Sequence, residues 1–569
     1  MHECMHQVAC TSMEHIDWHA ATGGDMQLPS PVELDADSLE RILGLVSDTG
    51  LLRGIHTARL VNRSWCQAVD SRAHRLCEVS NRYPAADISA LLRKTPNLTA
   101  IDMAFSSISS AGCRQLRRLQ LKELCLADCS RLASTDFSCV HQLTGLQVLK
   151  LSNLRTTASA ALTYCSTLLS LHTLELRDFT ALDEKLLIGL RQLTSLNTLS
   201  LVADEGGNAM LGTLSMQLLS WCAPQLTYLQ CGKVESTYPL EALRDLSQLQ
   251  VLSLTNCKPF LKQDSTGHDL LVQVAHLTQL SRLMVHQFPT HTLYYGQIHH
   301  DLRQLKGLRS LHIEQGRARG FVESLTALTG LVELVLLDKM TEVQSRHVVN
   351  DVLLTLFHLT RLELSVTGDV LVEGFRLFRN LPYLKHLKFA GSSGYDTKGV
   401  SNLFWGLTSL TGSVTSLSLR GSRFGAAVQG RYRSAAGAGV LDLDLGEFPV
   451  HSLQMFANVF PEAQCLRLTL SSLQELPLLP WSALKQLSVD WQPQPSDALS
   501  DSPVAMCESL AHLPSLRLLV IECSAVQMSG VSPFEVVADK HADLLQALPG
   551  VDVRVVQSDH VTMMQQLSS

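Results

Sequence analysis

The sequence predicts an α/β solenoid in which parallel strands line a concave face and helices cover the outside. Three observations predict it: a recurring leucine pattern, a strand-like ending to each copy, and helical spacing between copies. The pattern L-x-x-L-x-x-L-x-L recurs along the chain, for example as LTGLQVLKL at 143–151 and LTSLNTLSL at 193–201. From Met103 to Ile521 it recurs about every 26 residues, the length of one strand and one helix.

The L-x-L that closes each copy predicts a short strand, because side chains alternate between the two faces of a strand. Copies that are full or nearly full end at Leu151, Leu176, Leu201, Leu254, Val285, Ile313, Leu336, Leu364, Phe389 and Ile521. Weaker copies end at Met103, Leu126, Cys231, Leu419, Leu445, Leu470 and Val489. Residues near 551–556 predict a further strand, so we expect about 17 units over residues 81–557.

The segments between the strands predict helices. Residues 157–170 and 183–193 carry apolar side chains at helical spacing. One strand and one helix in each unit is the pattern of the leucine-rich repeat. A single unit cannot bury its leucines, whereas stacked units bury one continuous core inside a horseshoe. A leucine-rich helical array is the alternative, and the extended L-x-L endings disfavour it.

Composition narrows the class of protein. Hydrophobic residues make up 46% of the 569 residues and charged residues 17%, as expected for a chain with a packed core. The net charge of −7 argues against a dedicated nucleic-acid binder. We find no secretory signal and no apolar stretch long enough to span a membrane. We therefore expect no membrane partner, a cytoplasmic or nuclear location, and 15 cysteines held as reduced, mostly buried thiols.

Residues 28–80 precede the array and predict three short helices, between a tail at 1–27 and the first repeat; a second tail covers 558–569. Asp37 and Glu40 can form a capping box at the start of the first helix. Three helices of this length cannot bury a robust core alone, so they have to dock on the array or on a partner. The apolar stripes of these helices include Leu39, Ile42, Leu43, Leu51, Leu52, Val61 and Trp65.

This segment resembles the F-box. The matching residues are Leu34, Leu39, Ile42, Leu43, Gly50, Leu51, Leu52, Arg53, Leu60, Val61, Asn62, Arg63 and Trp65. Asp35 stands where the F-box usually has proline, Gly50 replaces its usual aspartate, and extra residues separate Arg53 from Leu60. Residues 124–143 also resemble the cysteine-containing repeats of F-box proteins, with Cys129 and Cys257 following their strands. Both cysteines are expected to be buried packing and turn residues.

The resemblance implies a non-catalytic, substrate-recognition subunit of an SCF-type E3 ubiquitin ligase. The F-box-like helices would bind a Skp-type adaptor, and through it a cullin, while the concave face and rim loops of the repeats would hold a protein substrate. The residues that the resemblance assigns to adaptor binding are Leu39, Ile42, Leu43, Leu51, Leu52, Val61 and Trp65. The alternative is a leucine-rich repeat scaffold outside any ligase, whose N-terminal helices only cap the solenoid. Neither interpretation requires a cofactor, and we expect none.

The sequence contains no motif that assigns a catalytic or metal-binding site. The chain has no P-loop, no H-E-x-x-H and no G-x-S-x-G, so we assign no catalytic residue. His2, Cys4, His6 and Cys10 are possible zinc ligands, but their spacing fits no common zinc module, and we expect no metal site.

The outward positions of the strands are the better candidates for binding. The basic and histidine residues expected at these positions in the middle repeats are Arg282, His286, His312, Arg361, His386, Lys388 and Arg420. Their acidic neighbours are Glu314, Glu333, Glu363, Asp442 and Asp444. A basic strip of this kind could bind an acidic or phosphorylated peptide. An ordinary solvated surface is the alternative.

Overall fold

The computed structural model describes residues 75–76 and most of 85–558. The gaps fall mainly between the end of a strand and the next helix, and the longest are 153–164, 204–212, 256–273, 287–301, 315–323, 338–346, 367–380, 392–413, 421–439, 492–509 and 525–543. The seven adaptor-binding candidates, Cys257 and the possible zinc ligands of the N-terminal tail lie outside the described residues.

A single sheet of 19 strands organises the described chain. Each strand pairs in parallel with the next one along the sequence, from β1 at one edge to β19 at the other, and the sheet is not closed. The strands are β1 (Arg75–Leu76), β2 (Ala100–Asp102), β3 (Glu123–Leu126), β4 (Val148–Leu151), β5 (Thr173–Phe179), β6 (Thr198–Ala203), β7 (Tyr228–Gly232), β8 (Val251–Thr255), β9 (Arg282–His286), β10 (Ser310–Glu314), β11 (Glu333–Leu337), β12 (Arg361–Val366), β13 (His386–Gly391), β14 (Ser416–Arg420), β15 (Asp442–Gly446), β16 (Cys465–Leu470), β17 (Gln486–Trp491), β18 (Leu518–Ser524) and β19 (Asp552–Ser558).

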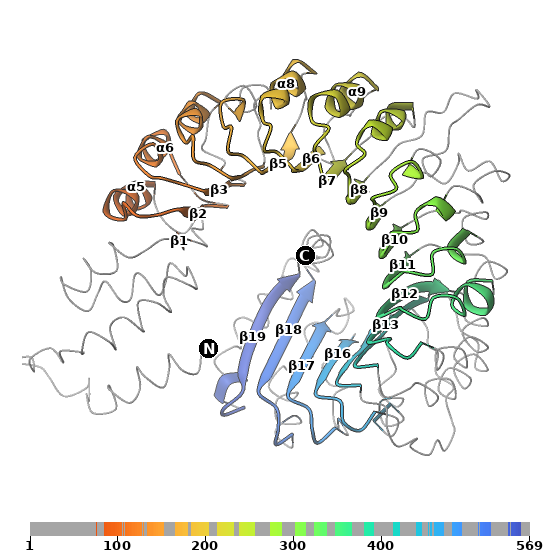
Figure 1. Cartoon of the computed structure of the whole chain (residues 1–569). Coiled ribbons are helices and arrows are strands. Elements are labelled where there is room, and N and C mark those ends of the chain that lie inside the picture. Colours follow the sequence, from red (N-terminus) through yellow and green to blue (C-terminus); the bar gives the residue numbers. More distant parts are fainter. Residues whose placement is uncertain are drawn as a thin grey trace, which may run out of the picture.

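The helices lie on the outer side of the arc that the sheet forms, and the strands line its inner side (Figure 1). The α-helices are α5 (Ala85–Lys94), α6 (Ser110–Leu116), α8 (Glu184–Gly189) and α9 (Thr213–Cys222). The remaining helical segments on this side are 3-10 and π helices: η1 (Ser134–Gln142), η2 (Leu190–Gln192), η3 (Tyr238–Asp245), η5 (Leu302–Gln304) and η6 (Val348–Val352). The helix predicted at 183–193 is confirmed as α8 followed by η2. Among the described residues, no helix is long and apolar enough to cross a membrane.

Two successive tight turns lead into the closing strand of a copy. In one copy, the Leu193 N–H donates to the Leu190 carbonyl at 2.9 Å, and the Leu196 N–H donates to the Leu193 carbonyl at 3.0 Å. Bonds across three residues are those of a 3-10 turn, in which residues three apart lie above one another. All three leucines therefore enter the core, and the following L-x-L adds two more from the strand.

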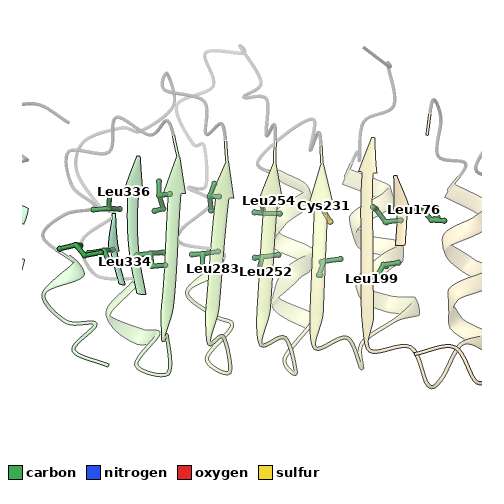
Figure 2. Close-up of a cluster of buried hydrophobic side chains, with 14 of the residues drawn as sticks. Leu176, Leu199, Cys231, Leu252, Leu254, Leu283, Leu334 and Leu336 are labelled. Atoms are coloured by element: carbon green, nitrogen blue, oxygen red, sulfur yellow. The ribbon is translucent and has the colours of Figure 1, made fainter. Parts of the chain in front are cut away.

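The core is a stack of these leucines. Leu199, Leu252, Leu283 and Leu334 form one row along the sheet, and Leu176, Cys231, Leu254 and Leu336 lie in a second row (Figure 2). Burying one leucine side chain stabilises a fold by about 1.5–3 kcal/mol, and each unit buries several.

Aromatic residues replace leucine in the later units. Phe389, Trp481 and Trp491 are fully buried. The indole Nε1–H of Trp481 donates to the carbonyl of Phe460 at 2.9 Å, which satisfies its polar atom inside the core.

The strand predictions hold with one correction. A strand is found at each predicted copy and at 551–556, and β1 is an additional strand that the pattern does not predict. The copy predicted to end at Leu470 is displaced by two residues, because Leu468 lies opposite Val489. A register shift between Asp444 and Gly446 accompanies the change.

Candidate partner-binding face

The outward positions of β9 to β13 place a set of polar side chains side by side on the inner face of the arc. Along each of these strands, the residues that alternate with the core leucines point to the opposite face of the sheet. Their exposure varies: Arg282 and His386 are exposed, whereas Ser310 and Glu363 are buried. We call this set the central strip; its members are Arg282, His286, Ser310, His312, Glu314, Glu333, Arg361, Glu363, His386 and Lys388.

His286 and Glu314 pair across neighbouring strands. Each follows the closing apolar residue of its copy, and the parallel register sets the two side by side. The Nδ1–H of His286 donates to Oε2 of Glu314 at 2.7 Å, and both side chains are half-buried. The hydrogen bond and charge of His286 hold the pKa of Glu314 below its usual range, although burial opposes this effect.

His312 lies beside this pair. Its ring centre is 4.6 Å from that of His286, with an angle of 66° between the ring planes. Burial, and then the proximity of His286, lower the pKa of His312 to about 4. His312 is therefore a neutral imidazole at pH 7. Its Nε2 atom is buried and has no hydrogen-bond partner among the described residues.

Glu363 lies between two basic side chains. Its carboxylate, only 5% exposed, accepts a hydrogen bond from Arg361 at 2.5 Å and lies 3.0 Å from the Lys388 ammonium. Burial alone would raise the pKa of Glu363, but the charges and hydrogen bonds of Lys388 and Arg361 outweigh burial and lower it. The side chain is therefore ionised at neutral pH.

Arg282 forms a third ion pair on this face. Its guanidinium lies 3.4 Å from the Glu333 carboxylate, which also accepts a hydrogen bond from the Ser310 hydroxyl at 2.8 Å. Three basic side chains of the central strip thus meet acidic partners within it. The strip is a mixed-charge surface, and this differs from the basic strip expected from the sequence.

The two remaining candidates lie further along. His386 is exposed at the start of β13, opposite Ser416, whose hydroxyl donates to Asp442. Arg420 ends β14 with its backbone opposite Ala390. The structure therefore brings six of the seven candidates onto β9 to β13 and places Arg420 on the next strand.

A polar contact that the sequence analysis missed spans β16 to β18. Arg467 donates to Glu522 at 2.7 Å, and the Ser488 hydroxyl donates to the same carboxylate at 3.1 Å. Comparing equivalent positions of successive copies is the signal that could have found it, because those positions become neighbours in a parallel sheet.

Most of the described cysteines are buried. Seven of the nine are buried, as the sequence analysis expected for most of them. The thiol of Cys129 donates to the carbonyl of Met103 at 3.1 Å and so ties a turn to the preceding repeat. Burial raises the pKa of Cys165 and of Cys523 to about 12, which leaves both thiols protonated at neutral pH.

Comparison with known proteins finds similar solved structures but no related sequence family. No family model matches the sequence, and no curated protein matches it. Among solved structures, a leucine-rich repeat protein of Leptospira interrogans is 16% identical with a TM-score of 0.37, over 86% of this chain and 98% of that one. The internalin InlF of Listeria monocytogenes is 14% identical with a TM-score of 0.31, over 72% and 93%.

Likeness at this level carries no information on function. The fold assignment rests on the chain itself: leucines at repeating positions, one strand in each unit, and an open parallel sheet. The described chain thus has a leucine-rich-repeat-like fold.

Proposed function

We propose that this chain is the substrate-recognition subunit of an SCF-type E3 ubiquitin ligase. One observation carries the proposal: an F-box-like segment stands directly before a long repeat array in the same chain. Residues 28–80 would bind a Skp-type adaptor, and through it a cullin. The array would hold a protein substrate on its concave face and rim loops. The chain itself performs no bond chemistry in this proposal, and it acts in the cytoplasm or nucleus.

The concave face suits protein recognition. A solenoid offers side chains at regular spacing on a rigid sheet, and the outward positions are free to vary from unit to unit. In the central strip, Arg282 and Arg361 remain about half exposed although each has an acidic partner. We infer that the partner presents both acidic and basic groups, because a purely acidic peptide would have to compete with Glu333 and Glu363.

The second candidate is a protein-binding scaffold with no ligase role. Solenoids need a cap over the open end of their core, and a helical segment before β1 could supply one. The two candidates differ in a single property, which is binding to the adaptor.

Adaptor binding is tested with the full chain and purified Skp-type adaptor. The test variant is Leu51→Ala/Leu52→Ala/Trp65→Ala, and the matched control is Leu169→Ala/Leu354→Ala/Tyr383→Ala, which truncates exposed apolar side chains of the array. Circular dichroism checks that both variants remain folded. We expect the wild type and the control to capture adaptor and the test variant to lose it. Failure of the wild type to bind adaptor at micromolar concentration would leave the scaffold as the function.

A further inference from the structure

We propose that His286, His312 and Glu314 form a binding site for a divalent transition-metal ion, with Zn²⁺ as the best fit. The inference goes beyond the proposed function and does not rest on it. It also departs from the expectation, drawn from sequence motifs, that the chain has no metal site.

The three donor groups are already close together. One ligand atom from each side chain lies within 4.8 Å of the other two, and Nδ1 of His286 is 2.7 Å from Oε2 of Glu314. Zinc binds imidazole nitrogen and carboxylate oxygen at about 2.0–2.2 Å, so donors around a tetrahedral ion lie about 3.3 Å apart. Binding would widen the His286–Glu314 separation slightly and shorten any that exceeds this value, changes of a size that side-chain rotation would provide.

The parallel register explains why these residues meet. His286 and Glu314 occupy equivalent positions in successive copies, and His312 lies two residues before Glu314 on the same face of β10. Two adjacent, regular strands hold all three side chains, which gives the site a rigid base.

His312 supplies an independent reason to expect a ligand. Its Nε2 atom is buried and has no hydrogen-bond partner among the described residues. Leaving a polar atom in that state is costly, and buried polar groups usually have a partner. A metal ion bound to this nitrogen would provide one. On His286, the ion would replace the proton that Nδ1 now shares with Glu314, and this proton would move to Nε2 of the same ring or to solvent.

The donor set selects the class of ion. Two imidazoles and one carboxylate are a common zinc set in which the fourth position is left to water or another ligand. Calcium and magnesium prefer oxygen donors and are disfavoured here. The nearby charges of Arg361 and Lys388 oppose a cation, but Glu363 lies between them and offsets part of that repulsion.

Isothermal titration of the metal-stripped full chain with Zn²⁺ tests the site. His2, Cys4, His6 and Cys10 could also bind zinc, so every protein carries Cys4→Ser/Cys10→Ser. The test variants are His312→Gln and Glu314→Gln, and His386→Gln is the control because it removes an exposed histidine of the same face. Circular dichroism without metal checks that the fold is kept.

We expect one Zn²⁺ per chain at micromolar concentration or below. His312→Gln and Glu314→Gln should each weaken binding at least about 100-fold, since removal of groups that merely orient ligands already costs 10–100-fold. His386→Gln should leave the affinity within about twofold of the parent, because it touches none of the proposed ligands. The proposal is overturned if the parent protein binds no zinc in this range, or if His312→Gln binds as tightly as the parent.

Discussion

Glu363 is the acidic side chain that pairs with two basic residues of the concave face. Its buried carboxylate holds Arg361 and Lys388 together, and the fold lowers its pKa. A group whose pKa is lowered in the folded state stabilises the fold above its ordinary pKa and loses that effect as pH falls through the folded pKa. The contribution of Glu363 is therefore complete at neutral pH and disappears in acid.

Replacement of Glu363 by glutamine tests this contribution. We expect Glu363→Gln to lower the free energy of unfolding at pH 7 by about 1–2 kcal/mol, a value reduced because Arg361 and Lys388 are partly exposed. Urea denaturation at pH 7 and again well below pH 4.5 measures it, and the difference from wild type should vanish at the lower pH. Glu123→Gln, which removes an exposed partner of Arg75, should have a smaller effect. A deficit that is equal at both pH values would show that lost packing, and not charge, is responsible.

At the scale of the repeating element, the sequence predicted part of the observed structure. The pattern L-x-x-L-x-x-L-x-L predicted the strand that closes each copy, because alternate side chains of a strand lie on the same face. It did not predict the tight turns that precede the strand. It did not predict the register of β16, where Leu466, Leu468 and Leu470 alternate without interruption. Two registers two residues apart therefore fit the same leucine pattern, and the pairing of Leu443 with Leu466 and of Leu468 with Val489 shows which one the chain adopts.

Leu252 tests the stacked core at the scale of one element. It is fully buried and lies between Leu229 and Leu283 of the neighbouring strands. We expect Leu252→Ala to lower the free energy of unfolding by about 2–5 kcal/mol, because the rigid strands on either side cannot collapse into the cavity. Urea denaturation measures the loss. Leu169→Ala, at a side chain that is 60% exposed, should change it little, and comparable losses at both sites would contradict the stacked core.

Across the whole molecule, the sequence predicted which residues lie on the concave face, but it did not predict how their charged side chains pair. The outward positions were correct for the central strip, since they follow from strand alternation. The ion pairs of Glu333 and Glu363 and the meeting of His286 with Glu314 were not predicted, although each follows from the copies being in register. The burial of His312 depends on the side chains around it in three dimensions, and no local pattern encodes it.

Recognition through the concave face is most directly measured by comparing two variants of equal charge change. Arg282→Glu/His386→Glu alters exposed residues of the central strip, whereas His276→Glu/Arg303→Glu alters exposed residues in the turn and η5 segment before β9 and β10. Each full-length variant is purified from cells, and the proteins that accompany it are quantified by mass spectrometry. Adaptor recovered in each sample serves as the internal standard, if the F-box-like segment binds it.

We expect the central-strip variant to lose a defined set of proteins that the wild type and the His276→Glu/Arg303→Glu variant both retain. Charge reversal on a recognition surface repels the partner, while the same change outside it does not. If the central-strip variant keeps every protein that the wild type binds, or if the other variant is the one that loses them, the concave face is not the recognition surface.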